Sequence, residues 1–149
     1  MSDKKELTPL EKVQAKREAM RLEWAAAEAA QNLIDQEALV DLEDEYGFGS
    51  VVSLKVPGFK KGLPTLAVVR SPGGGTGYYT KYKDQVRRAG KDAKKIGEAQ
   101  EQIGEACLVY PPEGDLRKSM LEAFPGLMLS AGIAAVGLAE LSADDEKKG

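Results

Sequence analysis

Apolar positions in the first third of the chain recur with the period of a helix. Thr8-Pro9-Leu10-Glu11 has the composition of a helix start, and no further proline or glycine occurs before Gly47. This pattern predicts one long helix over 9–46, with a break near Asp35 as an alternative. One seam of this helix carries Leu10, Val13, Met20, Trp24, Ala27, Ile34 and Ala38, interrupted by Arg17 and Gln31.

This seam is thin, and the helix carries many charges. Such a helix often pairs with a second helix, which belongs either to the same chain or to another copy. The apolar positions are less regular than a sustained coiled coil requires, so the sequence leaves the partner of this helix open.

Two β-branched runs follow the long helix. They are residues 50–56 (SVVSLKV) and 65–70 (TLAVVR), and the linker between them contains two glycines and two prolines. The pattern predicts a β-hairpin or two neighbouring antiparallel strands. Two strands alone are marginally stable, so helices must cover one face or another chain must extend the sheet.

The remaining pattern predicts four shorter helices. They are expected over 78–88, over about 93–110, from 113–115 onwards and over 127–141, with breaks at Gly90, Pro111-Pro112 and Phe124-Pro125-Gly126. The fold class is therefore α+β and mainly helical. We expect a flexible N-terminus (1–8), the long helix (9–46), a small α+β domain (48–142) and a charged disordered tail (143–149).

The last helix is apolar on almost every side. No charged residue occurs from Ala123 to Ala139, so its surface must be hidden in a core, a partner or a membrane. A membrane span needs about 20 apolar residues, which Leu127 to Ala139 does not reach, and we expect no membrane partner. Gly132 and Gly137 favour close helix approach. We expect Leu127, Leu129, Ile133 and Val136 to form core or partner interface.

The charges fall into three blocks. Residues 1–47 carry a net charge of −6, residues 48–97 carry +9 and residues 98–149 carry −6. The blocks could complement each other within the fold or between copies, or the basic middle could meet an acidic partner or nucleic acid. We favour the first interpretation. The electrostatic complement to acidic neighbours is then expected from Arg87, Arg88, Lys91 and Lys95.

Residues that carry chemistry are scarce. Histidine is absent, and the single cysteine, Cys107, lies in an apolar run that favours a buried structural thiol. The glycine-rich segment 71–77 lacks the spacing of a phosphate-binding loop, and the carboxylates at 43–45 fit a solvated helix end. We therefore expect no catalytic residue, no metal site and no cofactor. The polar start of the chain lacks a secretory signal pattern and favours a cytoplasmic location.

The order of elements over about two-thirds of the chain resembles a known family. A helix ends at Tyr46-Gly47, a valine-rich β-pair ends in Arg70-Ser71-Pro72, and a helix with tyrosines and basic residues follows. A short apolar run then ends at Pro111, and a final helix pair is split at Phe124-Pro125-Gly126-Leu127. This order resembles the phage tail assembly chaperones, small proteins encoded just before the tape measure gene.

The resemblance implies a function without catalysis. Proteins of this family are taken to coat the tape measure protein, keep it soluble and help recruit tail tube subunits in the host cytoplasm. This chain would then be an oligomeric binding protein whose partners are the tape measure protein and tail tube subunits. The alternatives are a structural tail or head–tail connector subunit and, less favoured, a nucleic-acid-binding accessory protein.

Overall fold

The computed structural model describes the backbone of residues 6–148 and the side chains of residues 6–140. The fold is α+β and mainly helical, as predicted, with a long N-terminal helix, an antiparallel sheet and four shorter helices. Part of the expected flexible N-terminus, residues 1–5, lies outside the described residues. The elements in chain order are α1 (Pro9–Tyr46), β1 (Val51–Lys55), β2 (Leu66–Arg70), α2 (Tyr78–Ala89), α3 (Ala93–Cys107), β3 (Leu108–Tyr110), α4 (Asp115–Ala123) and α5 (Leu127–Lys148).

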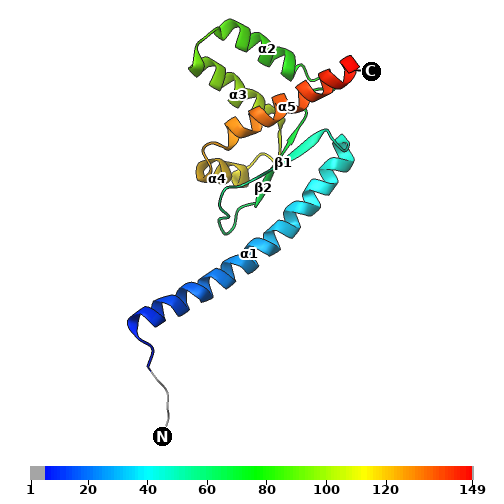
Figure 1. Ribbon diagram of the computed structural model, residues 1–149. Helices are drawn as coiled ribbons and strands as arrows, with labels where there is room; N and C mark the ends of the chain where they lie inside the picture. Colours follow the sequence, from blue (N-terminus) through cyan, green and yellow to red (C-terminus); the bar gives the residue numbers. More distant parts are fainter. Residues whose placement is uncertain (1–5, 149) are drawn as a thin grey trace.

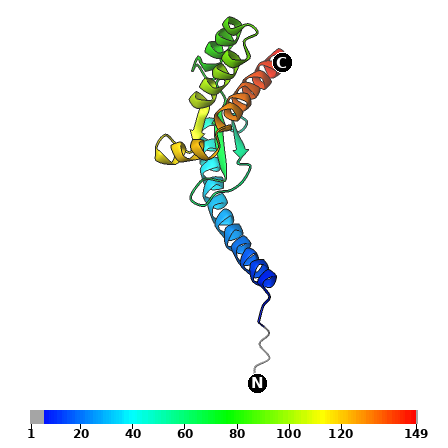
Figure 2. The same ribbon diagram turned by 90° about the vertical axis from the view of Figure 1, so that its left-hand side faces the viewer.

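Helix α1 begins and ends where its capping residues predict. The Thr8 hydroxyl accepts a hydrogen bond from the Glu11 amide at 3.1 Å, and Gly47 ends the helix at φ 97° with its amide bonded to the Glu43 carbonyl. The alternative of a break near Asp35 is wrong, because α1 runs unbroken for 38 residues. At 1.5 Å per residue its length is about 57 Å. Both views show its first half extending away from the rest of the molecule (Figures 1 and 2).

The sheet has three antiparallel strands in the order β1-β2-β3. The predicted hairpin is confirmed by the pairing of β1 with β2, from Val51↔Arg70 to Lys55↔Leu66. The third strand is a correction, since the sequence pattern extended the preceding helix to residue 110. Helix α3 instead ends at Cys107, and Leu108 pairs with Val69. Helical backbone is disfavoured at Tyr110 because Pro111 follows it. The edge of β2 that faces away from β1 offers backbone hydrogen bonds to residues 108–110 instead.

Helices cover both faces of the sheet. The core cluster joins Ala67 and Val69 of β2 to Ile103 of α3 and to Leu127 and Ala131 of α5. Helix α1 contacts β1 and β2 as well, and side chains alternate across a strand, so α1 lies on the other face. Because β2 is the central strand and is covered on both sides, its first four residues are buried.

The C-terminal half forms the second helical layer. Helices α2 and α3 form a helical hairpin with Gly90 at its turn, and α5 packs along α3 (Figure 1). Helices α4 and α5 are bent by 100° at the predicted Phe124-Pro125-Gly126 junction. Helix α5 extends to Lys148 rather than ending near 141. The expectation of a disordered tail over 143–149 stays a prediction, and Gly149 lies outside the described residues.

Candidate partner-binding surfaces

The base of α1 is fixed to the sheet by one buried carboxylate. Asp35 is fully buried, and its Oδ2 accepts hydrogen bonds from the Thr65 amide and hydroxyl, each at 2.6 Å. Its Oδ1 accepts from Gln31 Nε2 at 3.0 Å and from the Tyr110 hydroxyl at 2.5 Å. Asn32 adds a further hydrogen bond from its amide to Thr65 Oγ1 at 3.0 Å. This cluster ties α1 to the residue before β2 and to the last residue of β3.

Neutral donors satisfy the Asp35 carboxylate. Four hydrogen bonds to a charged acceptor compensate much of the cost of taking that charge out of water. The pKa of Tyr110 is raised well above its usual value, by burial first and then by its hydrogen bond and proximity to Asp35. The Tyr110 hydroxyl therefore stays protonated and continues to donate. The sequence pattern marks Asp35 only as the place of an alternative break, and it does not predict this role as an anchor.

A second contact marks where α1 leaves the folded body. The indole of Trp24 meets the ring of Phe59, from the loop between β1 and β2, edge to face at a centroid distance of 5.9 Å. In the same loop, Lys61 Nζ lies 5.3 Å from the centroid of the Trp24 ring and 3.1 Å from Glu23 Oε1. These contacts form the boundary between a supported half of α1 and a half that extends beyond the body.

The extending half of α1 exposes the seam that the sequence predicted. Every residue from 6 to 26 is exposed, including Leu10 at 66% and Met20 at 57%. The contacts of its side chains include the Thr8 cap, an ion pair between Glu18 and Arg21, and the Lys61 contacts near residue 24. Most helical stability in proteins comes from the packing of an apolar face, and residues 9–22 of α1 are exposed all round within the described part of the chain. Its apolar side chains are therefore the strongest candidate for a partner surface.

The four residues predicted on α5 lie in different environments. Leu127 is buried in the core cluster, and Val136 is partly buried against it. Leu129 is half-buried, whereas Ile133 is 55% exposed. The core role expected for α5 thus applies to Leu127 and Val136, and the outer face of α5 presents Ile133 to solvent.

Two glycines allow α5 to approach α3 closely. A Cβ atom at Gly104 of α3 would lie 2.7 Å from the amide nitrogen of Gly132, and one at Gly132 would lie 2.6 Å from the Gln100 carbonyl carbon. Both distances are shorter than real Cβ contacts, so neither position accepts a side chain unless the helices move apart. At Gly137, by contrast, a Cβ atom would meet no described atom within 4 Å. The expectation of close helix packing is confirmed at Gly132.

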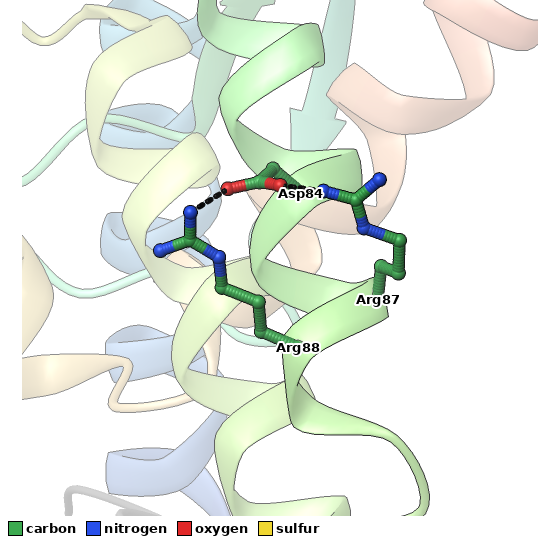
Figure 3. Close-up of polar contacts among 3 residues, drawn as sticks. All are labelled: Asp84, Arg87 and Arg88. Atoms are coloured by element: carbon green, nitrogen blue, oxygen red, sulfur yellow. Dashed lines mark hydrogen bonds and ion pairs between the residues drawn. The ribbon is translucent and has the colours of Figure 1, made fainter.

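The basic set predicted as an electrostatic complement lies around the turn between α2 and α3. Arg87 and Arg88 both pair with Asp84, the latter at 3.1 Å, and both arginine side chains remain 78% exposed (Figure 3). Lys91 and Lys95 are exposed beyond this ion pair. The structure brings these four residues to one end of the α2–α3 hairpin. The predicted apolar residues Leu127 and Ile133 belong to a different element, α5.

An apolar groove runs beside the edge strand β1. It has a volume of about 530 Å³ and is bounded by Leu54 and Val56 on one side and by Phe124 and Leu127 at the α4–α5 junction on the other. Its lining carries no acid–base pair. The sequence pattern does not predict this groove, because it forms only when the hairpin and the Phe124-Pro125-Gly126 junction come together.

The single cysteine is a core residue, as predicted. Cys107 is fully buried, and burial raises the pKa of its thiol to about 11. Nearby, Arg117 of α4 donates to the carbonyls of Leu108 and Pro111 at 2.7 and 2.8 Å. Burial lowers the pKa of this guanidinium. Both residues stabilise the region around β3.

Within the described residues, no group of three or more histidine, cysteine, aspartate or glutamate side chains is placed to hold a metal ion. Over the same part of the chain no single helix is long and apolar enough to cross a membrane, although the bent pair α4–α5 reaches the necessary length and composition when its two helices are taken together.

Comparisons of the chain with protein-family models, with curated proteins and with solved structures find no match.

Proposed function

We propose that this protein is a phage tail assembly chaperone that binds the helical tape measure protein and assists assembly of tail tube subunits. It would act in the host cytoplasm as a binding protein, with no catalytic residue and no cofactor. The proposal takes its family from the order of elements between Tyr46 and Leu127 and its mode of binding from the exposed half of α1.

The observation that carries the proposal is the uncovered apolar seam of α1. Leu10, Val13 and Met20 share this seam and are each more than half exposed, on a helix that extends beyond its own body. A partner helix laid along this seam would bury these side chains, with anchors at the spacing of successive helical turns. A long helical partner offers many such segments, so weak contacts repeated along it would give reversible coating.

The basic end of the α2–α3 hairpin would add an electrostatic contribution. Arg87, Arg88, Lys91 and Lys95 are exposed there, and the first and last thirds of the chain are acidic. Neighbouring copies along a coated partner would then meet through opposite charges, and salt would weaken that contact. The outer face of α5, with Ile133 exposed, is a second apolar contact available to a tail tube subunit.

The test is co-expression with the tape measure protein encoded in the same tail operon. We expect the wild-type chain to raise the soluble fraction of that protein and to co-purify with it. A variant carrying Leu10→Gln, Val13→Gln and Met20→Gln should lose both effects while keeping its own fold. Leu116→Gln is the control, since Leu116 is exposed on α4, away from α1.

The proposal fails if the tape measure protein is equally soluble with and without this chain. The chain would instead be a structural tail or connector subunit if it persists in purified particles in fixed stoichiometry. Retention of DNA or RNA that falls steeply with salt would favour the nucleic-acid-binding alternative.

A further inference from the structure

Helix α1 carries a second apolar stripe on the side away from the sheet. Residues seven apart lie on one stripe of a helix. Two such series run side by side here, at positions 15, 22, 29 and 36 and at positions 19, 26, 33 and 40, and Gln36 is their single polar member. Their large apolar members are Leu22, Leu33 and Val40, which are 63%, 64% and 62% exposed. The small members of the stripe, all exposed, are Ala15, Ala19, Ala26 and Ala29.

The stripe lies apart from both surfaces already described. The residues that attach α1 to the sheet, Gln31 and Asp35, lie roughly 120–180° around the helix from its apolar members at 100° per residue. The seam with Leu10 and Met20 also faces away from it. A partner on the stripe therefore meets neither the sheet nor the loop that contacts Trp24.

The central part of the stripe is symmetric about the midpoint between residues 27 and 28. Leu22 and Leu33 lie at equal distances on either side of that midpoint, as do Ala26 and Ala29. An antiparallel second copy centred there would therefore place each member of a pair against the other. The resulting layers are Leu22 with Leu33, Ala15 with Val40, Ala26 with Ala29, and Ala19 with the polar Gln36.

Charge complementarity selects the antiparallel arrangement. In that register Lys16 faces Glu37 of the second copy twice, while Glu18 and Glu23 face Leu39 and Ala30 of the second copy. A parallel pair would instead place Glu18 against Glu23 of the other copy twice, and this repulsion offsets the attraction between Glu11 and Lys16 in that arrangement. The alanines at the centre allow the two helices to approach closely, and the large residues lie towards the ends.

We propose that the stripe from Ala15 to Val40 is a homodimer interface, in which two α1 helices pair antiparallel and centre on residues 27 and 28. The two folded bodies then lie at opposite ends of the pair and on opposite sides of it. The interface leaves the Leu10–Met20 seam of both copies uncovered. The proposed function has neighbouring copies meet through opposite charges along a coated partner, and this dimer is a separate contact that forms without the tape measure protein.

Sedimentation equilibrium of the purified full chain tests the interface. Wild type should be a dimer, and Leu33→Glu should be a monomer, because each leucine is lost twice and burying one is worth about 1.5–3 kcal/mol, so the dissociation constant should rise at least about 100-fold. Met20→Gln is the matched control, since it is an exposed apolar residue on another face of the same helix, and it should leave the dimer intact. Circular dichroism checks that each variant keeps its fold.

Spin labels test the orientation. Labels at Lys12→Cys should lie about 45 Å apart in the antiparallel pair, because each position is some 15 residues from the midpoint at 1.5 Å per residue. Labels at Ala30→Cys should be close. Cys107 is buried and should remain unlabelled. Lys16→Glu or Glu37→Lys alone should weaken the dimer by about 3–10-fold, as expected for exposed ion pairs that occur twice, and the two together should restore it.

A monomeric wild type, a dimer disrupted by Met20→Gln but not by Leu33→Glu, or a short Lys12–Lys12 distance would each overturn the proposal. None of these outcomes depends on the tape measure protein, so the dimer can fail while the proposed function stands, and the reverse.

Discussion

Helices α1 and α5 differ in how far their apolar side chains are exposed. Helix α5 has no charged residue from Leu127 to Ala139, and it hides most of this surface against α3 and the sheet. Helix α1 alternates charges with apolar residues, yet it leaves Leu10, Leu22 and Leu33 more than 60% exposed. The apolar content of a helix therefore does not identify a partner surface. The geometry of the body decides which helix is covered, and here the less apolar helix is the uncovered one.

The largest effect is expected where α5 is packed most tightly. Gly132→Ala should lower the free energy of unfolding by about 3 kcal/mol or more, because the new methyl group overlaps the backbone of α3. Gly137→Ala is the control on the same helix, and it should be neutral or stabilising by up to about 1 kcal/mol because alanine has the higher helix propensity. Urea denaturation measures both. Equal losses at the two sites would contradict the difference in packing.

Helix α1 should be sensitive only where it is anchored. Asp35→Ala removes four hydrogen bonds and leaves the Thr65 and Tyr110 donors without their partner, so we expect a loss of about 3 kcal/mol. Asp41→Ala, at an exposed position on the same helix, should change stability by less than about 0.5 kcal/mol. Thermal unfolding of both variants checks this. A mild effect at Asp35 would mean that α1 is attached mainly by its apolar contacts.

Alkaline pH should weaken the layer that α5 covers. The pKa of the Cys107 thiol is raised to about 11 in the folded state, so the unfolded chain releases this proton first as pH rises. Stability from this group is complete below about pH 8 and falls by about 2 kcal/mol between pH 9 and 11. Urea titrations across this range measure the fall. Cys107→Ala should flatten this part of the profile, and an unchanged slope in that variant would assign it to other groups.

The smallest effect on stability is expected in the first half of α1. Leu10→Ala should change the free energy of unfolding by less than about 0.5 kcal/mol, because Leu10 is 66% exposed on the part of α1 that extends beyond the body. The same substitution at Leu127 should cost about 2–5 kcal/mol as a core truncation. Differential scanning calorimetry compares the two. A substantial loss at Leu10 in the isolated protein would show that its seam is covered in solution.

Local signals predicted most of the fold. Thr8 and Gly47 mark the ends of α1, the β-branched runs mark the hairpin, and Phe124-Pro125-Gly126 marks the bend between α4 and α5. Each of these features is determined by residues that are close together in the chain, so a short stretch of sequence is enough to predict it. Strand β3 was missed because only its pairing with β2, far away in the chain, distinguishes Leu108–Tyr110 from the end of a helix.

The candidate surfaces were predicted only in part. The seam of α1 was predicted, but whether it faces its own body depends on how far the body reaches along the helix. The sequence does carry a signal for the role of Asp35, because Gln31 and Asn32 precede it by about one helical turn and form a polar cluster with it on one face of the helix. The sequence does not distinguish the buried Leu127 from the exposed Ile133, because both are apolar residues of one apolar helix. Only the packing of α5 against α3 and the sheet determines which of them is covered.

The Asp35 cluster also has a mechanical consequence. The first turn of α1 lies about 26 residues from this anchor, which is a lever arm of about 40 Å at 1.5 Å per residue. A stiff helix held over its second half converts a sideways pull near Leu10 into a torque at the held part. The hydrogen bonds from Thr65 and Tyr110 would bear that torque, together with the contact between Trp24 and Phe59. Any assembly that moves the tip of α1 therefore acts directly on the sheet of the folded body.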